Sequence, residues 1–153
     1  MTVGPWFDDV VVGASHVSAG RTVTEADVVG FAGLSGDFCE LHTNADYAAG
    51  SPFGGRIAHG MLSLVLAHGL MVRAGWLVDS GIALLGWDRL RFVAPVRIGD
   101  TIRTHWRTLD AAPSRSRPDT GVVRDAVELR NQRNDAVMTA ELVTLVRRNP
   151  RKT

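Results

Sequence analysis

The pattern of apolar and polar positions along this chain changes near residue 80. Before that point, the most apolar segment is GMLSLVLAHGLMVRAGW, residues 60–76, which carries apolar side chains on nearly every helical face. A helix of that kind is normally surrounded by other parts of a protein or by lipid. Ser63, His68 and Arg73 interrupt it, so it falls short of the roughly 18 unbroken apolar residues that a membrane span requires. The pattern therefore predicts a helix buried within the protein.

After residue 80 the chain is typical of a series of strands. Runs rich in β-branched and aromatic residues are separated by turn or loop signals and cover residues 82–96, 101–109, 122–131 and 136–147. Within the second run, residues 102–107 alternate between uncharged side chains at the even positions and Arg or His at the odd ones, as expected for a strand with one solvated face. The segment 111–121, with two prolines, two serines and two arginines, is predicted to be a loop.

The first part of the chain predicts one extended segment and two short helices. Residues 14–23 are extended, and Thr24 followed by Asp27 starts a helix that ends before Gly36. A second helix runs from Asn44 to Ala49. One buried helix followed by several strands that must cover it indicates an α+β domain in which an antiparallel sheet wraps around the helix, which is the hot-dog fold.

Size and charge narrow the function classes. At 153 residues the chain fits one domain, 1–153, whose basic residues at 146–153 are expected to form a solvated tail. Lys+Arg 17 against Asp+Glu 16 gives no sign of a nucleic-acid binder. The absence of Lys or Arg before Arg21 argues against a secretory signal, and the single cysteine, Cys39, agrees with a reducing compartment. We therefore expect a cytoplasmic protein that binds neither nucleic acid nor a membrane.

The segment 35–59 holds the candidate chemistry. Asp37 supplies a carboxylate and His42 an imidazole, and a glycine-rich stretch leads from them into the apolar helix. On an α-helix a spacing of five residues would point the two side chains about 140° apart, so the pair can cooperate only from a loop. Gly36 before the pair and Asn44 after it favour that loop. Cys39 and His42 have a C-x-x-H spacing, but no cluster supplies further ligands, so no metal site is expected.

On these motifs the sequence resembles the MaoC-like dehydratases, the family that contains the (R)-specific enoyl-CoA hydratases, from Val23 to Val146. In that family a small residue and Gly-Asp precede a His five positions after the Asp, and Gly-Gly-x-Ile-x-His-Gly-Met opens the central helix. The matching residues here are Ser35, Gly36, Asp37 and His42, then Gly54 to Met61, and a third similar segment runs from Arg89 to Ile102. Two positions depart from the pattern: Cys39 and Glu40 replace Asn-Pro, and His68 stands where bacterial relatives often have serine.

The resemblance implies reversible hydration of a 2-enoyl thioester to the (R)-3-hydroxyacyl thioester, on coenzyme A or an acyl-carrier protein, without a metal or redox cofactor. Asp37 and His42 would hold the water, and the Gly60 N–H would bind the thioester oxygen. The substrate-binding residues it implies are Arg56, Ile57, His59, Met61 and His68. Structural roles stay open for three of them: His59 as a residue that orients the turn or caps the helix, His68 as a core histidine, and Arg56 as a surface arginine.

Two other functions fit the same framework. A carboxylate can activate water against the carbonyl carbon, which would make the protein a hot-dog thioesterase. Alternatively, the replacements at Cys39 and Glu40 fit a non-catalytic subunit that binds acyl thioesters. In each case we expect a homodimer, because folds of this kind rarely leave sheet edges uncovered.

Overall fold

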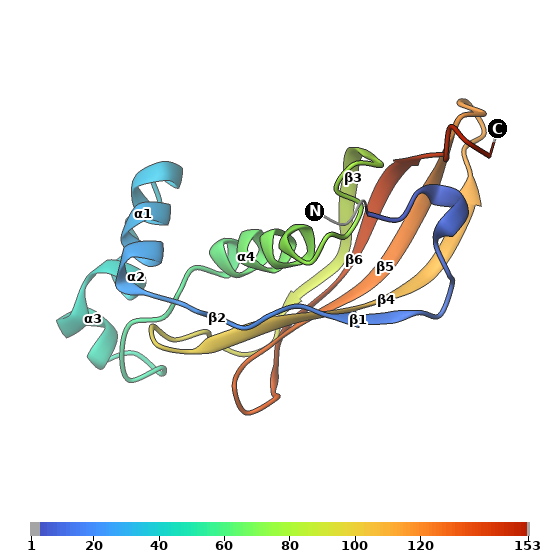
Figure 1. Cartoon of the computed structure of the whole chain (residues 1–153). Helices are drawn as coiled ribbons and strands as arrows, with labels where there is room; N and C mark the ends of the chain where they lie inside the picture. The colour runs from blue at the N-terminus through green and yellow to red at the C-terminus, as the bar shows by residue number, and fades with distance from the viewer. Residues whose placement is uncertain (1–3, 153) are drawn as a thin grey trace.

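A long antiparallel sheet curves around one long helix, as the computed structural model in Figure 1 shows for residues 4–152. The strands are β1 (Ser15–Val17), β2 (Arg21–Thr22), β3 (Gly81–Phe92), β4 (Thr101–Pro113), β5 (Thr120–Arg130) and β6 (Ala136–Arg147). The helices are η1 (Phe7–Asp9), α1 (Glu25–Ser35), α2 (Glu40–Thr43), α3 (Ala45–Ala49) and α4 (Gly60–Arg73). The predicted α+β hot-dog fold is thereby confirmed, with α4 as its central helix.

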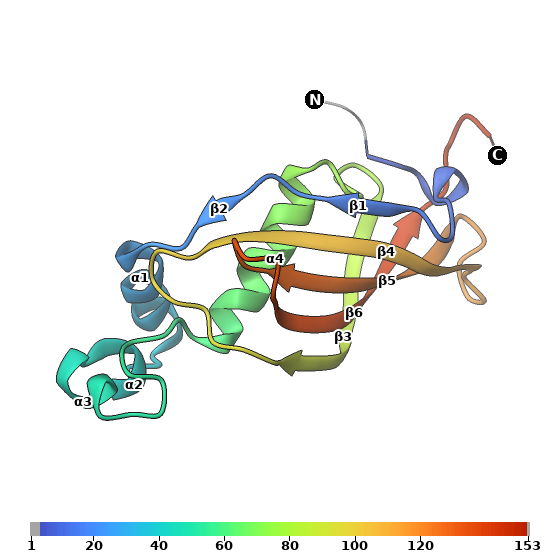
Figure 2. The same cartoon turned by 90° about the horizontal axis from the view of Figure 1, so that it is seen from below.

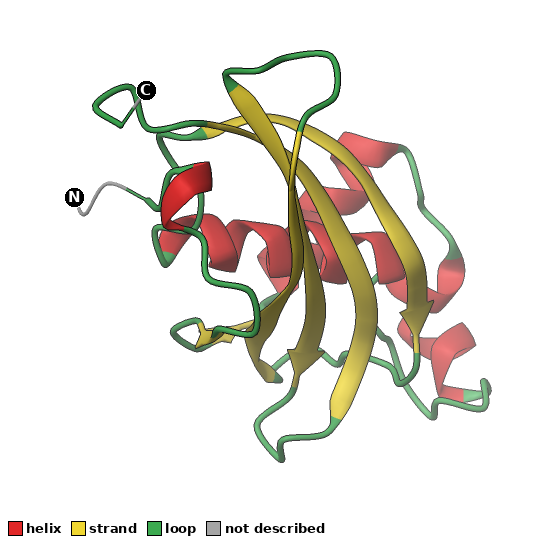
Figure 3. Cartoon of the chain, turned by 90° about the vertical axis from the view of Figure 1, so that its right-hand side faces the viewer, coloured by secondary structure: helices red, strands yellow, loops and turns green. Residues whose placement is uncertain are grey.

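The sheet combines segments that lie far apart in the sequence. Its strand order is β1-β4-β5-β6-β3, and β2 pairs with the first two residues of β4. All pairs are antiparallel, and β1 joins β4 with Ser15 opposite Arg107. Figure 2 shows α4 crossing the concave face of this sheet, and Figure 3 shows the strands bending around the helix. Because β3 follows α4 directly and pairs only with β6 among the described strands, it forms one edge of the sheet.

The central helix is less buried than its sequence predicts. One face packs into the core through residues that include Leu62, Leu66 and Leu70. Thr104 of β4 donates its hydroxyl hydrogen to the Ala67 carbonyl at 3.0 Å, which links the sheet to the helix. A stripe on the other face stays exposed in the single chain, at Met61, Val65 and Val72. None of the helices between residues 4 and 152 is both long and apolar enough to cross a membrane.

The start and end signals of the short helices act as predicted. The Thr24 hydroxyl accepts the Asp27 N–H while the Asp27 carboxylate accepts the Thr24 N–H, a reciprocal cap at the start of α1. Gly36 ends α1 with φ 77°, a left-handed conformation that favours glycine. The Asn44 side chain accepts two backbone N–H groups at the start of α3. These helices therefore follow from local side-chain chemistry.

Two segments predicted to be irregular are more ordered. The predicted loop 111–121 shrinks to 114–119, because the ladder between β4 and β5 continues to the pair Pro113–Gly121. The predicted basic tail 146–153 begins inside β6. The residues that follow the strand pack against η1, whereas a tail surrounded by solvent was predicted. Lys152 pairs with Asp9 at 2.5 Å, and the Arg148 guanidinium lies 5.4 Å from the centre of the Phe7 ring. The ion pair lowers the pKa of the Asp9 carboxyl.

Asp125 on β5 carries a carboxyl group that is fully buried in the core. It accepts hydrogen bonds from the Trp76 indole at 2.9 Å and from the Thr108 hydroxyl at 2.8 Å. Burial raises the pKa of Asp125 above its ordinary value of 3.8, although the two hydrogen bonds and the nearby His16 oppose the rise. The native protein therefore holds this proton at pH values where the unfolded chain has released it.

We expect Asp125→Asn to stabilise the protein at neutral pH. Between pH 3.8 and the higher pKa of the native state, Asp125 is protonated in the native protein and ionised in the unfolded chain. The free energy of unfolding of the wild type therefore falls as the pH rises through this range. Asparagine keeps an acceptor for Trp76 and can donate to Thr108, and it carries no carboxyl group to ionise, so the free energy of unfolding of the variant at pH 7 should exceed that of the wild type. Urea titrations at pH 4 and 7 measure this. The exposed Asp110→Asn serves as control, and equal pH dependence in wild type and Asp125→Asn would contradict the expectation.

Candidate active site

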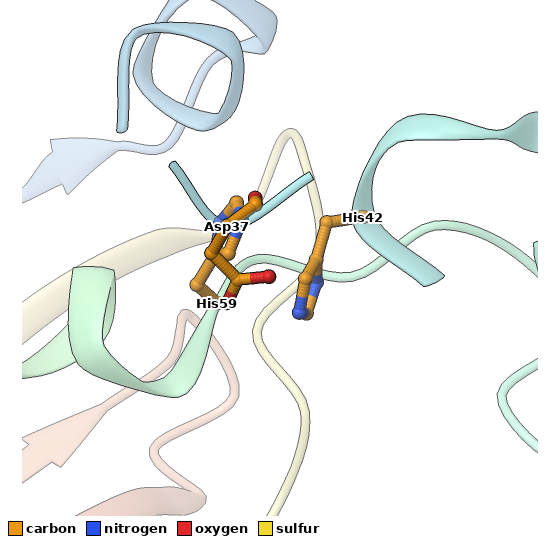
Figure 4. A group of neighbouring side chains, drawn as sticks. All are labelled: Asp37, His42 and His59. Atoms are coloured by element: carbon orange, nitrogen blue, oxygen red, sulfur yellow. The ribbon is translucent and has the colours of Figure 1, made fainter. Parts of the chain in front are cut away.

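Three polar side chains from separate segments meet at the start of α4 (Figure 4). Asp37 lies in the loop after α1, His42 lies on α2, and His59 directly precedes α4. One nitrogen from each histidine and a carboxylate oxygen of Asp37 all lie within 4.8 Å of one another. The structure therefore brings the predicted pair together. The prediction that both side chains come from a loop is wrong for His42, which sits in the single helical turn of α2.

The His42 ring is fixed by one hydrogen bond. Its Nδ1 lies 2.8 Å from the carbonyl oxygen of Ile57. Since a carbonyl only accepts, we assign the ring hydrogen to Nδ1, which leaves Nε2 with a lone pair. Ile57 is itself held by a bridge to Arg97 in the turn after β3. The arrangement gives a rigidly mounted imidazole whose second nitrogen can take up a proton.

Asp37 is held by bonds within its own loop. Its N–H donates to the Ser35 hydroxyl at 3.2 Å, and its Oδ1 accepts the Cys39 N–H at 3.2 Å. In Figure 4 the carboxylate points toward the His42 ring. Cys39 provides no side-chain cap for α2, whereas the Glu40 carboxylate accepts an N–H of Asn44 at 2.8 Å. With Cys39 and Glu40 in place of Asn-Pro, two hydrogen bonds hold this loop: Cys39 N–H to the Asp37 carboxylate, and the Asn44 side chain to the Glu40 carboxylate.

His59 lies beneath this pair and is 2% exposed. Its Nε2 lies 2.9 Å from the backbone oxygen of Asp37, and its ring centre lies 3.9 Å from that of His42. The possibility that it caps α4 is wrong, because its side chain makes no capping bond. The contact with the Asp37 carbonyl agrees with the other structural role predicted for it, orientation of the turn.

A cavity of about 320 Å³ opens beside His42. Gly60 forms part of its wall, and the rest is mostly apolar: Phe53, Ile57, Ala58, Ser63, Phe92, Val93, Ala94, Pro95, Val96 and Val137. A Cβ atom on Gly60 would lie 3.0 Å from the Phe92 ring, so glycine allows close packing there. The N–H groups of a first helical turn lack acceptors within the helix and carry its positive dipole end. This end of the cavity can therefore stabilise an oxygen that gains negative charge.

Of the five predicted substrate-binding residues, Ile57 lines this cavity, His59 lies behind its wall, and the other three lie elsewhere. Arg56 donates from Nε to the His42 carbonyl at 2.6 Å and pairs with both carboxylate oxygens of Glu25 at 2.8 and 3.1 Å. Met61 is exposed. His68 lines a second cavity of about 210 Å³ farther along α4, where burial lowers the pKa of its imidazole. Their predicted roles in binding stay predictions.

Two features of the site were not predicted. One is the clamp from Arg56 to Glu25, which ties the α2 backbone to the first turn of α1 across 31 sequence positions. The other is the Phe31 ring of α1, whose centre lies 4.9 Å from that of His59. Neither leaves a spacing signal in the sequence. Both depend on how α1 docks against the start of α4.

Two imidazoles and a carboxylate are also a donor set that zinc accepts. His42 and His59 each have one nitrogen bonded to a carbonyl, and the remaining Nδ1 of His59 is buried. Only His42 Nε2 and Asp37 are left to face an ion, which is fewer than the usual three or four protein ligands. The expectation of no metal thus stays a prediction: dialysis against a chelator should leave activity unchanged, and a loss restored by zinc would contradict it.

Comparison with known proteins gives one family. A family model described as "MaoC like domain" matches residues 11–130. "Protein MaoC" of Klebsiella aerogenes is 45% identical over 98 residues, which are 64% of this chain and 29% of that protein. The "(R)-specific enoyl-CoA hydratase" of Rhodospirillum rubrum is 41% identical over 97 residues, 63% of this chain and 65% of that protein. The chain thus spans less than two thirds of either relative.

A solved structure agrees in shape over nearly the whole chain. The crystal structure of the MaoC-like dehydratase from Rhodospirillum rubrum superposes with a TM-score of 0.85 and 31% sequence identity. The match covers 96% of this chain and 99% of that one.

Proposed function

This chain belongs to the MaoC-like dehydratase family, and on that basis we propose that it catalyses reversible hydration of a 2-enoyl thioester to the (R)-3-hydroxyacyl thioester. The observation that carries the proposal is the arrangement at the mouth of one cavity. A histidine with a free Nε2 and a carboxylate lie within 4.8 Å of each other, and the first turn of α4 forms the adjoining wall. The relative named as an (R)-specific enoyl-CoA hydratase supports the same reaction class.

The reaction needs a water that loses a proton, a proton for the α-carbon, and a stabilised thioester oxygen. In this proposal Asp37 and His42 hold one water between them. As the water oxygen bonds to the β-carbon, the pair takes up one of its protons, and a proton from the pair goes to the α-carbon on the same face. One water is thus added across the double bond, and the pair ends in its starting protonation state.

The thioester oxygen collects the negative charge during this step. We place it at the N–H of Gly60, where the positive end of the helix dipole favours the charge. The mostly apolar walls of the cavity suit the acyl chain. Coenzyme A or an acyl-carrier protein as the carrier, and a cytoplasmic location, remain predictions.

A direct assay separates this proposal from its alternatives. The purified protein is incubated with crotonyl-CoA and longer 2-enoyl-CoAs, while enoyl absorbance and free thiol are followed together. Loss of absorbance without thiol release supports hydration. Thiol release would indicate the thioesterase instead. Silence in both channels, with acyl-CoA still bound in a calorimetric titration, would indicate the non-catalytic subunit.

We further propose a homodimer formed through the β3 edge. This strand exposes Leu84 and Leu85, each 52% accessible, and the exposed stripe on α4 includes Val65 at 55%. An uncovered apolar edge strand readily pairs with another chain, and a second copy would cover strand and stripe together. Because Phe92 at the end of β3 lines the cavity beside His42, the partner would lie next to the site.

We expect Leu84→Glu to shift the protein from dimer to monomer in light scattering and to lower specific activity, because it buries a charge in the proposed interface. Wild-type protein should lose specific activity on dilution through the dissociation range. The matched control is Leu34→Glu, at an 86% exposed position on α1. A wild-type monomer with full activity would contradict the proposed dimer.

A further inference from the structure

His59 makes contact with both members of the proposed catalytic pair without lining the cavity. Ala58 and Gly60, its two neighbours in the chain, are wall residues, whereas His59 points away and is 2% exposed. Its ring touches His42 on one side, with centres 3.9 Å apart and planes inclined by 32°. On another side it meets the ring of Phe31, at 4.9 Å. A residue so placed can influence the chemistry only through its neighbours.

The hydrogen bonding of His59 assigns its tautomer. Nε2 lies 2.9 Å from the Asp37 carbonyl oxygen, so Nε2 donates and carries the ring hydrogen. Nδ1 then carries a lone pair, and this atom is buried with no hydrogen-bond partner among the described residues. Leaving a buried polar atom without a partner is unfavourable, and an apolar side chain of similar size would avoid it. The bond from Nε2 to the Asp37 carbonyl is therefore the hydrogen bond that favours a histidine over an apolar side chain at this position.

The backbone of Asp37 needs such a bond. Asp37 follows the left-handed Gly36 and is exposed, and the described bonds of its own N–H and carboxylate go to residues two positions away. His59 reaches it from 22 positions along the chain and ties it to the start of α4. The other member of the pair is His42, whose Nδ1 is bonded to the Ile57 carbonyl. The tilted His59 ring, with its centre 3.9 Å away, restricts the His42 imidazole further. One side chain thus fixes where the carboxylate and the imidazole stand relative to Gly60.

We propose that His59 is a positioning residue that holds Asp37 and His42 at their working separation, an inference that rests on the proposed hydratase function. It donates no proton to substrate and contacts no substrate atom. Its removal should therefore lower kcat and leave KM nearly unchanged, because the cavity wall stays intact while the water is held less well. Displacements of about 1 Å at such a pair can lower rates about a hundredfold.

Two substitutions at this position form a matched pair. Glutamine places an amide N–H about where His59 has Nε2, and asparagine places it about where His59 has Nδ1. With crotonyl-CoA we expect His59→Asn to lower kcat at least about tenfold with KM within about threefold of wild type. His59→Gln should recover kcat to within about threefold of wild type. Circular dichroism and thermal melts establish that both variants are folded.

The outcomes separate this inference from the proposed function. Wild-type kcat in folded His59→Asn, or a loss in His59→Gln as large as in His59→Asn, would overturn the positioning role. A wild-type protein without hydratase activity would refute the proposed function instead. In that case, or if the variants do not fold, long-range ¹H–¹⁵N NMR of the wild type decides. We expect His59 with its hydrogen on Nε2 and His42 with its hydrogen on Nδ1, and a His59 hydrogen on Nδ1 would overturn the assignment.

Discussion

Replacement of Asp37 by asparagine should lower the kcat of crotonyl-CoA hydration at least about a hundredfold, the usual scale for loss of an acid or base group. Asparagine has nearly the same size as aspartate, and its amide oxygen can still accept the Cys39 N–H that closes the loop. What it cannot do is exchange a proton with the water held against His42. The loss should therefore appear in kcat, while the melting temperature stays close to that of the wild type.

The matched control for this substitution is Glu40→Gln, which removes one negative charge three residues away. Glu40 accepts an N–H of Asn44 through an oxygen that glutamine retains. If Asp37→Asn and Glu40→Gln reduce kcat equally, the effect is one of charge in the loop, and Asp37 does not belong to the mechanism. A folded Asp37→Asn with near-normal turnover would have the same meaning.

A loss of similar size, at least about a hundredfold in kcat, is expected for His42→Asn. The asparagine side chain can place an N–H about where His42 has Nδ1 and so keep the bond to the Ile57 carbonyl. It has no nitrogen lone pair to replace Nε2. The substitution therefore removes the base and preserves the anchor, and kcat measured with crotonyl-CoA tests the base alone.

His105→Asn is the control for that variant. His105 lies on β4, on the face opposite the buried Thr104 and Trp106, and does not line the cavity beside His42. It should change neither kcat nor KM. A His42→Asn variant that is folded and turns over at the wild-type rate would remove His42 from the proposed mechanism, whatever the outcome for Asp37.

The fold could be predicted because its main signals are local. The apolar run at 60–76 and the strand-like runs after residue 80 each identify their element without reference to the rest of the chain, and the structure has both. The reciprocal cap of Thr24 and Asp27 likewise involves neighbours. The sequence pattern ends β4 at residue 109 and starts β5 at residue 122, whereas the ladder between them continues to the pair Pro113–Gly121, because those pairs depend on the partner strand. The docking of the C-terminal residues on η1 depends on contacts about 140 positions away, at Lys152 and Asp9.

Part of the candidate site could likewise be predicted from the sequence, and part depends on contacts between distant segments. The motif spacing identified Asp37 and His42 as a pair, and the two do converge. The turn of α2 that carries His42 was missed because four residues are too few to show helical periodicity. The contacts of Arg56 and His59 were missed because each joins the segment before α4 to a segment 14 to 31 positions earlier. Such contacts exist only once α1 has docked.

The helices α1 to α3 project beyond the sheet in Figure 1, and several of their apolar side chains, such as Leu34, Phe38 and Tyr47, are exposed in the single chain. α1 is anchored by Val28, which lies in the hydrophobic core, and by Phe31, which packs against the core. The remaining links are hydrogen bonds to Arg56, Ile57 and His59 in the segment before α4, and few apolar contacts support α2 and α3. Regions with few buried apolar contacts open at lower free energy than the core. On heating, this projection should therefore separate from α4 while the sheet is still intact, so that inactivation precedes unfolding and is reversed by cooling.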